Sequence, residues 1–257
     1  MFFEKYPFIA YVVSENIICR GGVCCMKKVF LGIGHGGSDC GAIGNGLREK
    51  DLNLKQGLFC EKHLKRHGVL VMLSRYKDED DSTRDEVYES NLFNPDLAVD
   101  LHTNAGGGSG FEVFHSVVSS AIGDSFARNI NDEIVCRGYK SRGIKTKVNV
   151  DGRDYFGFIR ETNCPAVIAE MAFIDNKLDI RNFDEDHEIE AYCICLVRGI
   201  LKTLGIEYRH ETNEESNFED GDDLYRVVCG VYKDRINALK QQEKIQSLGV
   251  TSFIKRG

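Results

Sequence analysis

Short apolar runs alternate with longer amphipathic segments between residues 28 and 204. The apolar runs have the length of buried strands, and the amphipathic segments repeat their apolar residues at helical spacing. The predicted strands cover residues 29–33, 69–73, 97–101, 111–115 and 166–169, and the predicted helices cover residues 52–67, 82–91, 119–137 and 188–204. This alternation favours an α/β fold, in which a mostly parallel twisted sheet carries helices on both faces. We assign residues 26–208 to this domain.

Residues 1–25 differ from the rest of the chain. Their longest apolar stretch, residues 8–13, is too short for the core of a signal peptide, and it lacks a basic start and a small-residue cleavage site. We therefore expect no export signal. One hypothesis makes Met26 the natural start and reads residues 20–22 as a translated ribosome-binding site. The alternative is a weakly packed tail, so residues 1–25 are interpreted as a non-native or disordered extension.

The chain changes character again after residue 208. Residues 209–223 carry seven acidic residues against one arginine and almost nothing apolar, which predicts an extended acidic linker. Residues 224–257 regain a strand–helix–strand pattern and carry seven Lys and Arg residues against two acidic ones. A segment this short buries little surface by itself. We expect a small C-terminal βαβ module that pairs with a second copy or docks on the main domain.

Composition narrows the classes of function. Hydrophobic residues make up 42% of the chain, which is enough for a core, and a net charge of −7 argues against a protein that coats nucleic acid. No apolar run approaches the roughly 18 residues that span a bilayer, so no membrane insertion is expected. The ten cysteines form no CxxC pair, which excludes the spacing of zinc ribbons. Scattered cysteines of this kind are typical of small buried side chains in a reducing compartment.

Three residues in this pattern could hold a metal ion. His35 and His102 each follow a predicted strand, and Glu49 precedes a predicted helix. Two imidazoles and one carboxylate, with a fourth position for water, are a known catalytic zinc set. Zinc would lower the pKa of that water toward about 7. Each signal is weak alone, because a histidine at a strand end is more often a loop or packing residue.

Glu170 adds a carboxylate at the same edge of the predicted sheet, since it follows the apolar run of residues 165–169. In a zinc hydrolase it would take a proton from the water and pass it to the leaving nitrogen. Alone, it could equally be a helix cap or a salt-bridge partner.

Several dispersed motifs carry a resemblance to a known family. They are GHGGSDCGA at residues 34–42, GLREKDLNL at 46–54, LSR at 73–75, Asn91, LHTNA at 101–105 and PAVIAEMAFIDN at 165–176. Together they resemble the zinc-dependent N-acetylmuramoyl-L-alanine amidases of the amidase-3 type. The resemblance covers about residues 28–204, nearly all of the main domain.

The resemblance implies one Zn²⁺ held by His35, Glu49 and His102, with Glu170 as the catalytic acid and base. It implies peptidoglycan as the substrate, cut at the amide that joins the lactyl group of N-acetylmuramic acid to L-alanine. Asn104 would help to orient the site. Asp100 stands where the family usually has serine, and its carboxylate either orients an imidazole or faces away.

The C-terminal segment has a weaker resemblance. Residues 225–234, with 237–238 and 248–249, are similar to one half of a SPOR domain, a peptidoglycan-binding module. A whole SPOR domain has two such halves, so wall binding is expected only if two copies meet in a homodimer. The alternative is a solvated dimerisation piece without wall binding.

The order of parts also resembles a phage or prophage endolysin that lyses a Gram-positive, clostridial-type host. Such an enzyme is made in the host cytoplasm without a signal peptide and acts on the cell wall after release. The alternatives are a bacterial wall-remodelling or sporulation amidase, a catalytically silent wall-binding protein, and a zinc peptidase that cuts another bond.

Overall fold

The computed structural model describes residues 17–19, 22–24, 26–118, 120–183 and 185–210. The predicted C-terminal module and nearly all of the predicted linker lie outside these residues, as do residues 1–16 of the N-terminal extension. The described part of that extension forms a two-stranded antiparallel hairpin of β1 (Ile17–Cys19) and β2 (Gly22–Cys24).

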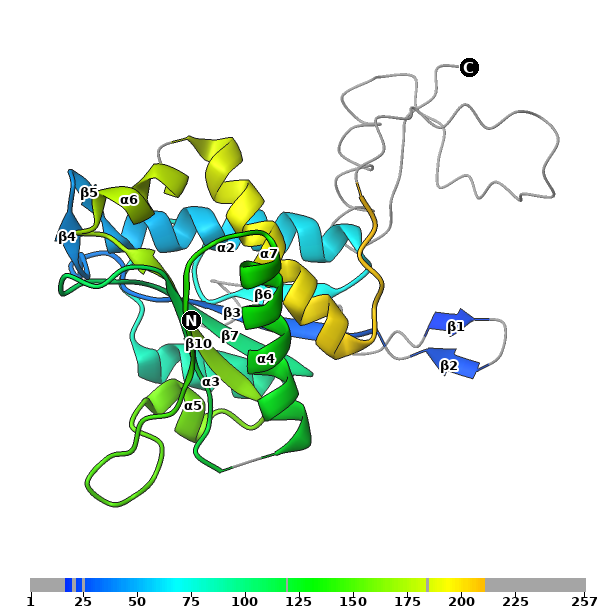
Figure 1. The fold of residues 1–257 in the computed structure, drawn as a ribbon. Coiled ribbons are helices and arrows are strands. Elements are labelled where there is room, and N and C mark those ends of the chain that lie inside the picture. Colours follow the sequence, from blue (N-terminus) through cyan, green and yellow to red (C-terminus); the bar gives the residue numbers. More distant parts are fainter. Residues whose placement is uncertain (1–16, 20–21, 25, 119, 184, 211–257) are drawn as a thin grey trace, which may run out of the picture.

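A mostly parallel sheet forms the centre of the domain, as predicted, and it has six strands where the sequence predicted five (Figure 1). Its order is β6-β3-β7-β10-β8-β9, and all neighbours are parallel except β10 and β8. The strands are β3 (Lys28–Ile33), β6 (Leu70–Leu73), β7 (Leu97–Asn104), β8 (Phe111–Phe114), β9 (Ser141–Lys145) and β10 (Ala166–Phe173). The single antiparallel pair makes the sheet mixed and mostly parallel. A separate small hairpin joins β4 (Ile43–Gly44) to β5 (Leu47–Arg48).

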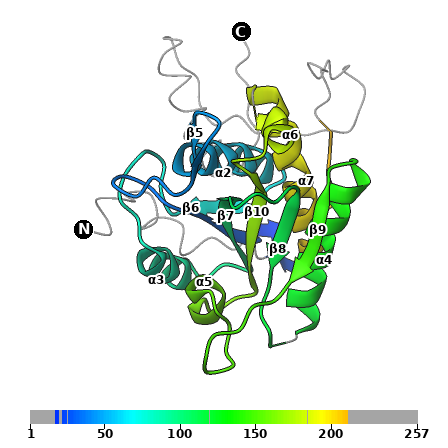
Figure 2. The ribbon, with the colours of Figure 1, turned by 60° about the vertical axis from the view of Figure 1, so that its left-hand side comes forward.

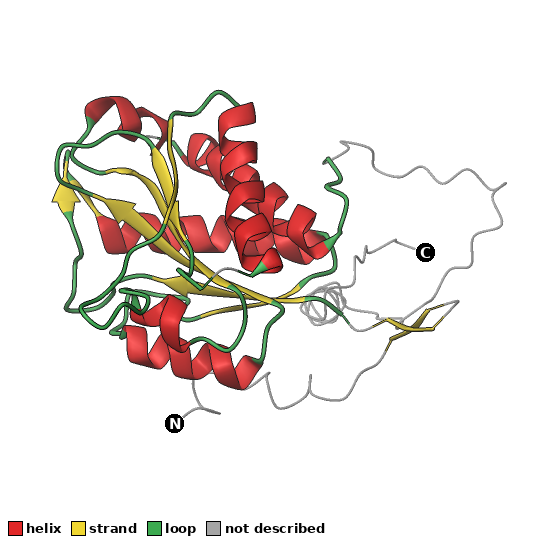
Figure 3. Cartoon of the chain, turned by 60° about the horizontal axis from the view of Figure 1, so that its bottom comes forward, coloured by secondary structure: helices red, strands yellow, loops and turns green. Residues whose placement is uncertain are grey.

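Helices cover both faces of the sheet (Figures 2 and 3). One face carries α2 (Glu49–Arg66), α4 (Ala121–Cys136) and α7 (Asp186–Leu204), and the main core lies beneath them. The other face carries α3 (Thr83–Phe93) and the short α5 (Gly157–Glu161), over a much smaller apolar cluster. The short α6 (Lys177–Ile180) and the 3-10 turn η2 (Arg181–Phe183) connect β10 to α7. Among the described helices, none is both long and apolar enough to cross a membrane.

Alternation along the strands gives the two faces different chemistry. On β7, Val99 and Leu101 point into the main core, whereas Asp100 and His102 belong to the opposite face. The same alternation on β10 places Ala169 in the core and Glu170 on the face with α3 and α5. The apolar cluster under α3 and α5 is small and does not extend to the ends of these strands. On that face the strand ends carry polar residues.

Three predicted boundaries were wrong by three residues or more, and all of them concern the site. Strand β7 continues to Asn104 and β10 continues to Phe173, so His102 and Glu170 lie within strands and not after them. Glu49 is the first residue of α2, three residues before the predicted start. In each case the pattern of apolar residues stops at a polar side chain, while the backbone hydrogen bonding continues. Strand β9, the β4–β5 hairpin and helices α5 and α6 had no predicted counterpart, because their sequences are short and largely polar.

The expectation of buried, unpaired cysteines is confirmed in part: none of the six in the described domain forms a disulfide, three of them are buried, and Cys136 is exposed. The six free thiols lie at positions 40, 60, 136, 164, 193 and 195. Cys60, Cys193 and Cys195 are fully buried in the main core, where they act as small apolar side chains.

Candidate metal centre and active site

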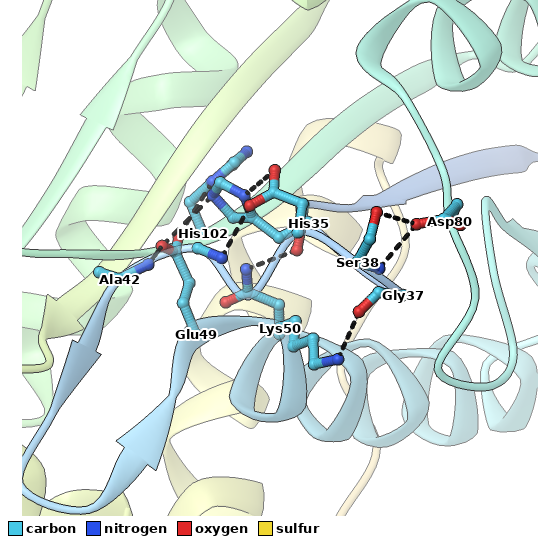
Figure 4. A network of polar contacts seen from close by, with 12 residues as sticks. His35, Gly37, Ser38, Ala42, Glu49, Lys50, Asp80 and His102 are labelled. Atoms are coloured by element: carbon cyan, nitrogen blue, oxygen red, sulfur yellow. Dashed lines mark hydrogen bonds and ion pairs between the residues drawn. The ribbon is translucent and has the colours of Figure 1, made fainter.

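The structure brings together the three residues that the sequence marks as metal ligands. One ligand atom from each of His35, Glu49 and His102 lies within 4.8 Å of the other two. Figure 4 shows the three side chains pointing toward one another. They come from three places in the fold: the loop directly after β3, the first turn of α2 and the second half of β7.

Glu49 connects the two histidines through its two carboxylate oxygens. Oε2 lies 3.3 Å from Nε2 of His35, and Oε1 lies 3.1 Å from Nδ1 of His102. The backbone N–H groups of Ala42 and Thr103 also donate to this carboxylate, at 2.8 and 3.0 Å. Burial opposes the charge of Glu49, but the hydrogen bonds from the histidines and from Ala42 outweigh it and hold its pKa well below the ordinary range. The carboxylate is therefore fixed in place and charged.

A second carboxylate holds the far nitrogen of each imidazole. Asp39 Oδ2 lies 2.8 Å from His35 Nδ1, and Asp100 Oδ2 lies 3.2 Å from His102 Nε2. When a metal ion displaces the inner protons that bond Glu49 and the outer nitrogens keep theirs, His35 Nε2 and His102 Nδ1 offer their lone pairs to the metal. Such carboxylate–histidine pairs fix the tautomer of a metal ligand and raise its basicity.

Gly32 on β3 and Gly34 directly after it make room for this arrangement. A Cβ on Gly32 would lie 2.9 Å from Asp100 Oδ1, and a Cβ on Gly34 would lie 2.3 Å from the ring of His102. A larger residue at either position would displace the side chain of Asp100 or His102. His35 itself has a left-handed backbone, with φ 65°, which is uncommon for a residue other than glycine and occurs often at functional sites.

The donor set fits a zinc ion. It consists of two neutral-capable imidazoles and one carboxylate, which is a three-ligand set of catalytic zinc sites. The carboxylates of Asp100 and Glu49 raise the pKa of His102 well above its ordinary value, although burial works against them. His102 is thus a strong base that a metal ion or a proton would bind.

Glu170 stands beside this centre on the neighbouring strand. It is the register partner of His102 in the parallel β7–β10 pair, so the two side chains share a face of the sheet. Burial raises the pKa of Glu170 to about 7, and His102 only partly offsets that shift. Its Oε2 is buried and has no hydrogen-bond partner among the described residues. A buried carboxylate oxygen without a partner, beside a candidate metal site, fits a group that exchanges protons with a bound molecule.

Asn104 lies outside the metal centre. Its Nδ2 donates to Glu112 Oε1 at 2.8 Å, and Glu112 is the register partner of Glu170 on the other side of β10. Arg142 Nε donates to Oε2 of the same carboxylate at 2.6 Å, and Lys145 forms a short ion pair with it. Asp39, Glu112 and Arg142 were not among the predicted site residues. For Asp39 a signal was present, since it lies four residues after His35 in the glycine-rich motif.

A cavity of about 540 Å³ opens in front of His35 and His102. Its far wall is acidic and includes Asp80, Asp81 and Asp85. Part of this wall braces the metal centre, because Asp80 accepts hydrogen bonds from the backbone and hydroxyl of Ser38 at 2.7 Å (Figure 4). The nearby Asp78 pairs with Lys50 at 2.8 Å.

The chain matches the Amidase_3 family, N-acetylmuramoyl-L-alanine amidase, over residues 29–202, and it belongs to this family. It is 31% identical over 232 residues to the sporulation-specific N-acetylmuramoyl-L-alanine amidase of Bacillus subtilis, an alignment that covers 89% of this chain and 84% of the relative. It is also 33% identical over 189 residues to the endolysin of Bacillus phage SPP1, covering 70% of this chain and 67% of the relative.

Solved structures agree with the family. The catalytic domain of CwlV, an N-acetylmuramoyl-L-alanine amidase from Bacillus (Paenibacillus) polymyxa, is 25% identical with a TM-score of 0.63, and the match covers 71% of this chain and all of that domain. Cwp6 from Clostridium difficile is 32% identical with a TM-score of 0.68, over 70% of this chain and 30% of that chain.

Proposed function

We propose that this chain is a zinc-dependent amidase that hydrolyses the amide between the lactyl group of N-acetylmuramic acid and L-alanine of the stem peptide. The observation that carries the proposal is the meeting of His35, Glu49 and His102 within 4.8 Å, in a chain of the amidase family. Glu170, on the adjacent strand, supplies the carboxylate that hydrolysis requires.

Zinc bound by His35, Glu49 and His102 would supply Lewis acidity toward the scissile carbonyl and lower the pKa of a water molecule beside it. Glu170 accepts a proton from the attacking water and gives it to the amide nitrogen as L-alanine leaves. In the metal-free protein burial raises the pKa of Glu170 to about 7, which is suited to a group that gains and loses a proton near neutral pH. Asp39 and Asp100 keep the two imidazoles in the tautomers that leave a lone pair for the metal.

The experiment that tests this function is the digestion of purified Gram-positive peptidoglycan, with and without a zinc chelator. Newly freed amino groups are labelled, and the residue that carries them is identified. We expect new N-terminal L-alanine that disappears with the chelator and returns when Zn²⁺ is added. New amino groups on another residue would indicate a zinc peptidase, and no release with bound zinc would indicate a silent wall-binding protein.

We further propose that the enzyme is an endolysin that is made in the host cytoplasm and acts on the wall after release. The similarity to a phage endolysin supports this setting. The sporulation amidase is the second candidate, because its alignment of 232 residues extends beyond the 29–202 family match. The time of transcription separates the two: an endolysin gene is expressed late after prophage induction, and a sporulation gene is expressed in sporulating cells.

The C-terminal segment, residues 224–257, remains a proposed wall-binding module that works as a homodimer. Its net charge of +5 in an acidic chain is suited to an anionic cell wall. Truncation after Ile206 should retain hydrolysis of soluble muropeptides and weaken sedimentation with whole walls. Unchanged sedimentation would contradict wall binding by this segment, and sedimentation equilibrium of the full chain tests the dimer.

A further inference from the structure

Positive charge is concentrated along one edge of the sheet. Residues 137–150, which include edge strand β9, contain five Lys and Arg residues and no acidic residue, although the whole chain has a charge of −7. The cavity wall on the other side of the metal centre is acidic. In the order of the strands, the candidate catalytic groups therefore lie between an acidic cavity wall and a basic sheet edge.

A β-bulge directs two of these cations to the same point. Phe111 pairs with Ser141 and Val113 pairs with Ile144, so Arg142 and Gly143 together oppose the single residue Glu112. Side chains three residues apart on a regular strand point to opposite faces. The extra residue in the bulge brings both side chains to the same face, so Arg142 and Lys145 both reach the Glu112 carboxylate. Gly143 accommodates the bulge with φ 85°.

Arg142 is held in a geometry that leaves the end of its guanidinium group open. Nε donates to Glu112 at 2.6 Å, and the guanidinium carbon lies 5.1 Å from the centre of the Phe173 ring. Its two terminal nitrogens make no hydrogen bond to any described residue, and the side chain is 41% exposed. Because Asn104 and Lys145 also bind Glu112, that carboxylate does not depend on Arg142 alone. A fixed guanidinium fork with free N–H groups is suited to a carboxylate.

The distance between Glu170 and Arg142 indicates which carboxylate of the substrate Arg142 could bind. Glu112 lies directly beside Glu170, and Arg142 is one strand further, so about 10 Å separates the strands that carry Arg142 and Glu170. An extended peptide spans at most about 3.5 Å per residue, so a group two or three residues beyond the cut bond reaches Arg142. The carboxyl of N-acetylmuramic acid is consumed in the scissile amide, so free carboxylates belong to the peptide side.

We propose that Arg142 binds the free α-carboxylate of the second stem-peptide residue, the D-glutamate after L-alanine, and thereby directs the peptide along β9. This inference rests on the proposed amidase function and adds a specificity. The enzyme prefers stem peptides whose second residue is a carboxylate over those in which it is amidated to isoglutamine. Lys145 adds charge at the same place, while the guanidinium supplies the paired hydrogen bonds.

The test compares two soluble substrates, MurNAc-L-Ala-γ-D-Glu-L-Lys and its isoglutamine counterpart, which differ only in this group. We expect kcat/KM of the unaltered enzyme to be about tenfold higher for the carboxylate substrate, from hydrogen bonds to a charged group. Arg142→Ala should remove this preference by slowing only the carboxylate substrate. Arg142→Lys should restore part of it, since it keeps the charge and loses the fork. Arg137→Ala, at the exposed C-terminal end of α4, is the matched control and should change neither rate.

The outcomes are separable from those of the amidase proposal. If the unaltered enzyme cleaves both substrates equally, or if Arg142→Ala slows both by the same factor, the carboxylate site is wrong and the amidase function stands. If neither substrate is cleaved with zinc bound, the amidase proposal fails. In that case calorimetric binding of the free peptide L-Ala-γ-D-Glu-L-Lys and its isoglutamine form still tests Arg142, and equal affinities would overturn its role.

Discussion

The two faces of the central sheet are built from the same strands but do different work. The face under α2, α4 and α7 takes every second residue into a dry core, such as Val99 and Leu101. The opposite face takes the residues between them, and there Asp100 and His102 pair in the candidate metal centre. The comparison teaches that strand alternation lets one short sequence specify stability on one side and chemistry on the other.

The faces also differ in how they tolerate charge. Asp100 is only 2% exposed, and its Oδ1 has no hydrogen-bond partner among the described residues. Glu86 is buried nearby, and its burial together with Asp100 raises its pKa well above the ordinary value. Buried carboxylates this close together cost folding free energy in the metal-free protein. A bound cation would offset this cost on the face of the candidate site, whereas the core face stabilises the fold by burying apolar side chains.

Glu170→Gln should separate the two faces most clearly, because it should lower activity and raise the stability of the metal-free protein. Loss of the general base should lower kcat by about 10² to 10⁴, with zinc content unchanged by metal analysis. At pH 8 the raised pKa of Glu170 means that its charged form destabilises the folded state, so the glutamine variant should unfold at a higher temperature in the metal-free protein. At pH 5 the folded state holds Glu170 in its neutral form, so little of this cost remains and the difference should shrink. Retained turnover would reject Glu170 as the acid and base.

Asp100→Asn should weaken zinc binding by about 10- to 100-fold, because His102 loses the carboxylate that fixes its tautomer and raises its basicity. Competition with a chromophoric chelator measures the affinity without relying on turnover. Asp39→Asn is the comparison variant, because Asp39 makes the equivalent contact with His35 but is exposed. Its effect on zinc affinity should be smaller, since solvent screens the His35–Asp39 pair. An unchanged zinc affinity in Asp100→Asn would show that this carboxylate has no influence on the metal.

Zinc affinity should rise with pH. The pKa of His102 is raised by Asp100 and Glu49 against the effect of burial, and that of His35 is raised chiefly by its hydrogen bond to Glu49. Each proton that zinc must displace weakens apparent binding by about tenfold per pH unit below the histidine pKa. Titrations at pH 6, 7 and 8 check this, and buffers with different ionisation enthalpies report the number of protons released. Affinity that stays constant between pH 6 and 8 would contradict it.

Gly199→Ala is expected to have the smallest effect on turnover. Its effect should fall on the stability of the core face. Helix propensity alone predicts stabilisation by about 1 kcal/mol. The structure predicts the opposite, because a Cβ on Gly199 would lie 2.5 Å from the Cα of Ile130 where α7 crosses α4. We expect a loss of about 1–3 kcal/mol in the free energy of unfolding, measured by urea denaturation. Activity per folded molecule should be unchanged, and a gain in stability would show that the helices separate at low cost.

Most strands of the sheet and the main candidate site residues were predictable from the sequence. The apolar runs located five of the six sheet strands, and the glycine-rich motif and strand ends identified His35, Glu49, His102 and Glu170 as site residues. The lengths of β7 and β10 were not predictable, because the polar side chains that extend them on the catalytic face resemble the start of a loop. Edge strand β9 was missed for a related reason: its sequence SRGIK has a single apolar residue, and pairing with β8 supplies the rest of its stability.

By itself, the sequence determined the fold class and the family, and it predicted the candidate site residues, since these depend on local patterns and on the types of side chain. Only the tertiary structure decided which atoms meet. Asp39 and Asp100 hold opposite nitrogens of two histidines, Asn104 turns to Glu112, and a bulge aims Arg142 at the same carboxylate. These contacts join residues on different strands through register, and register depends on the whole sheet. No pattern along a single stretch of chain contains that information.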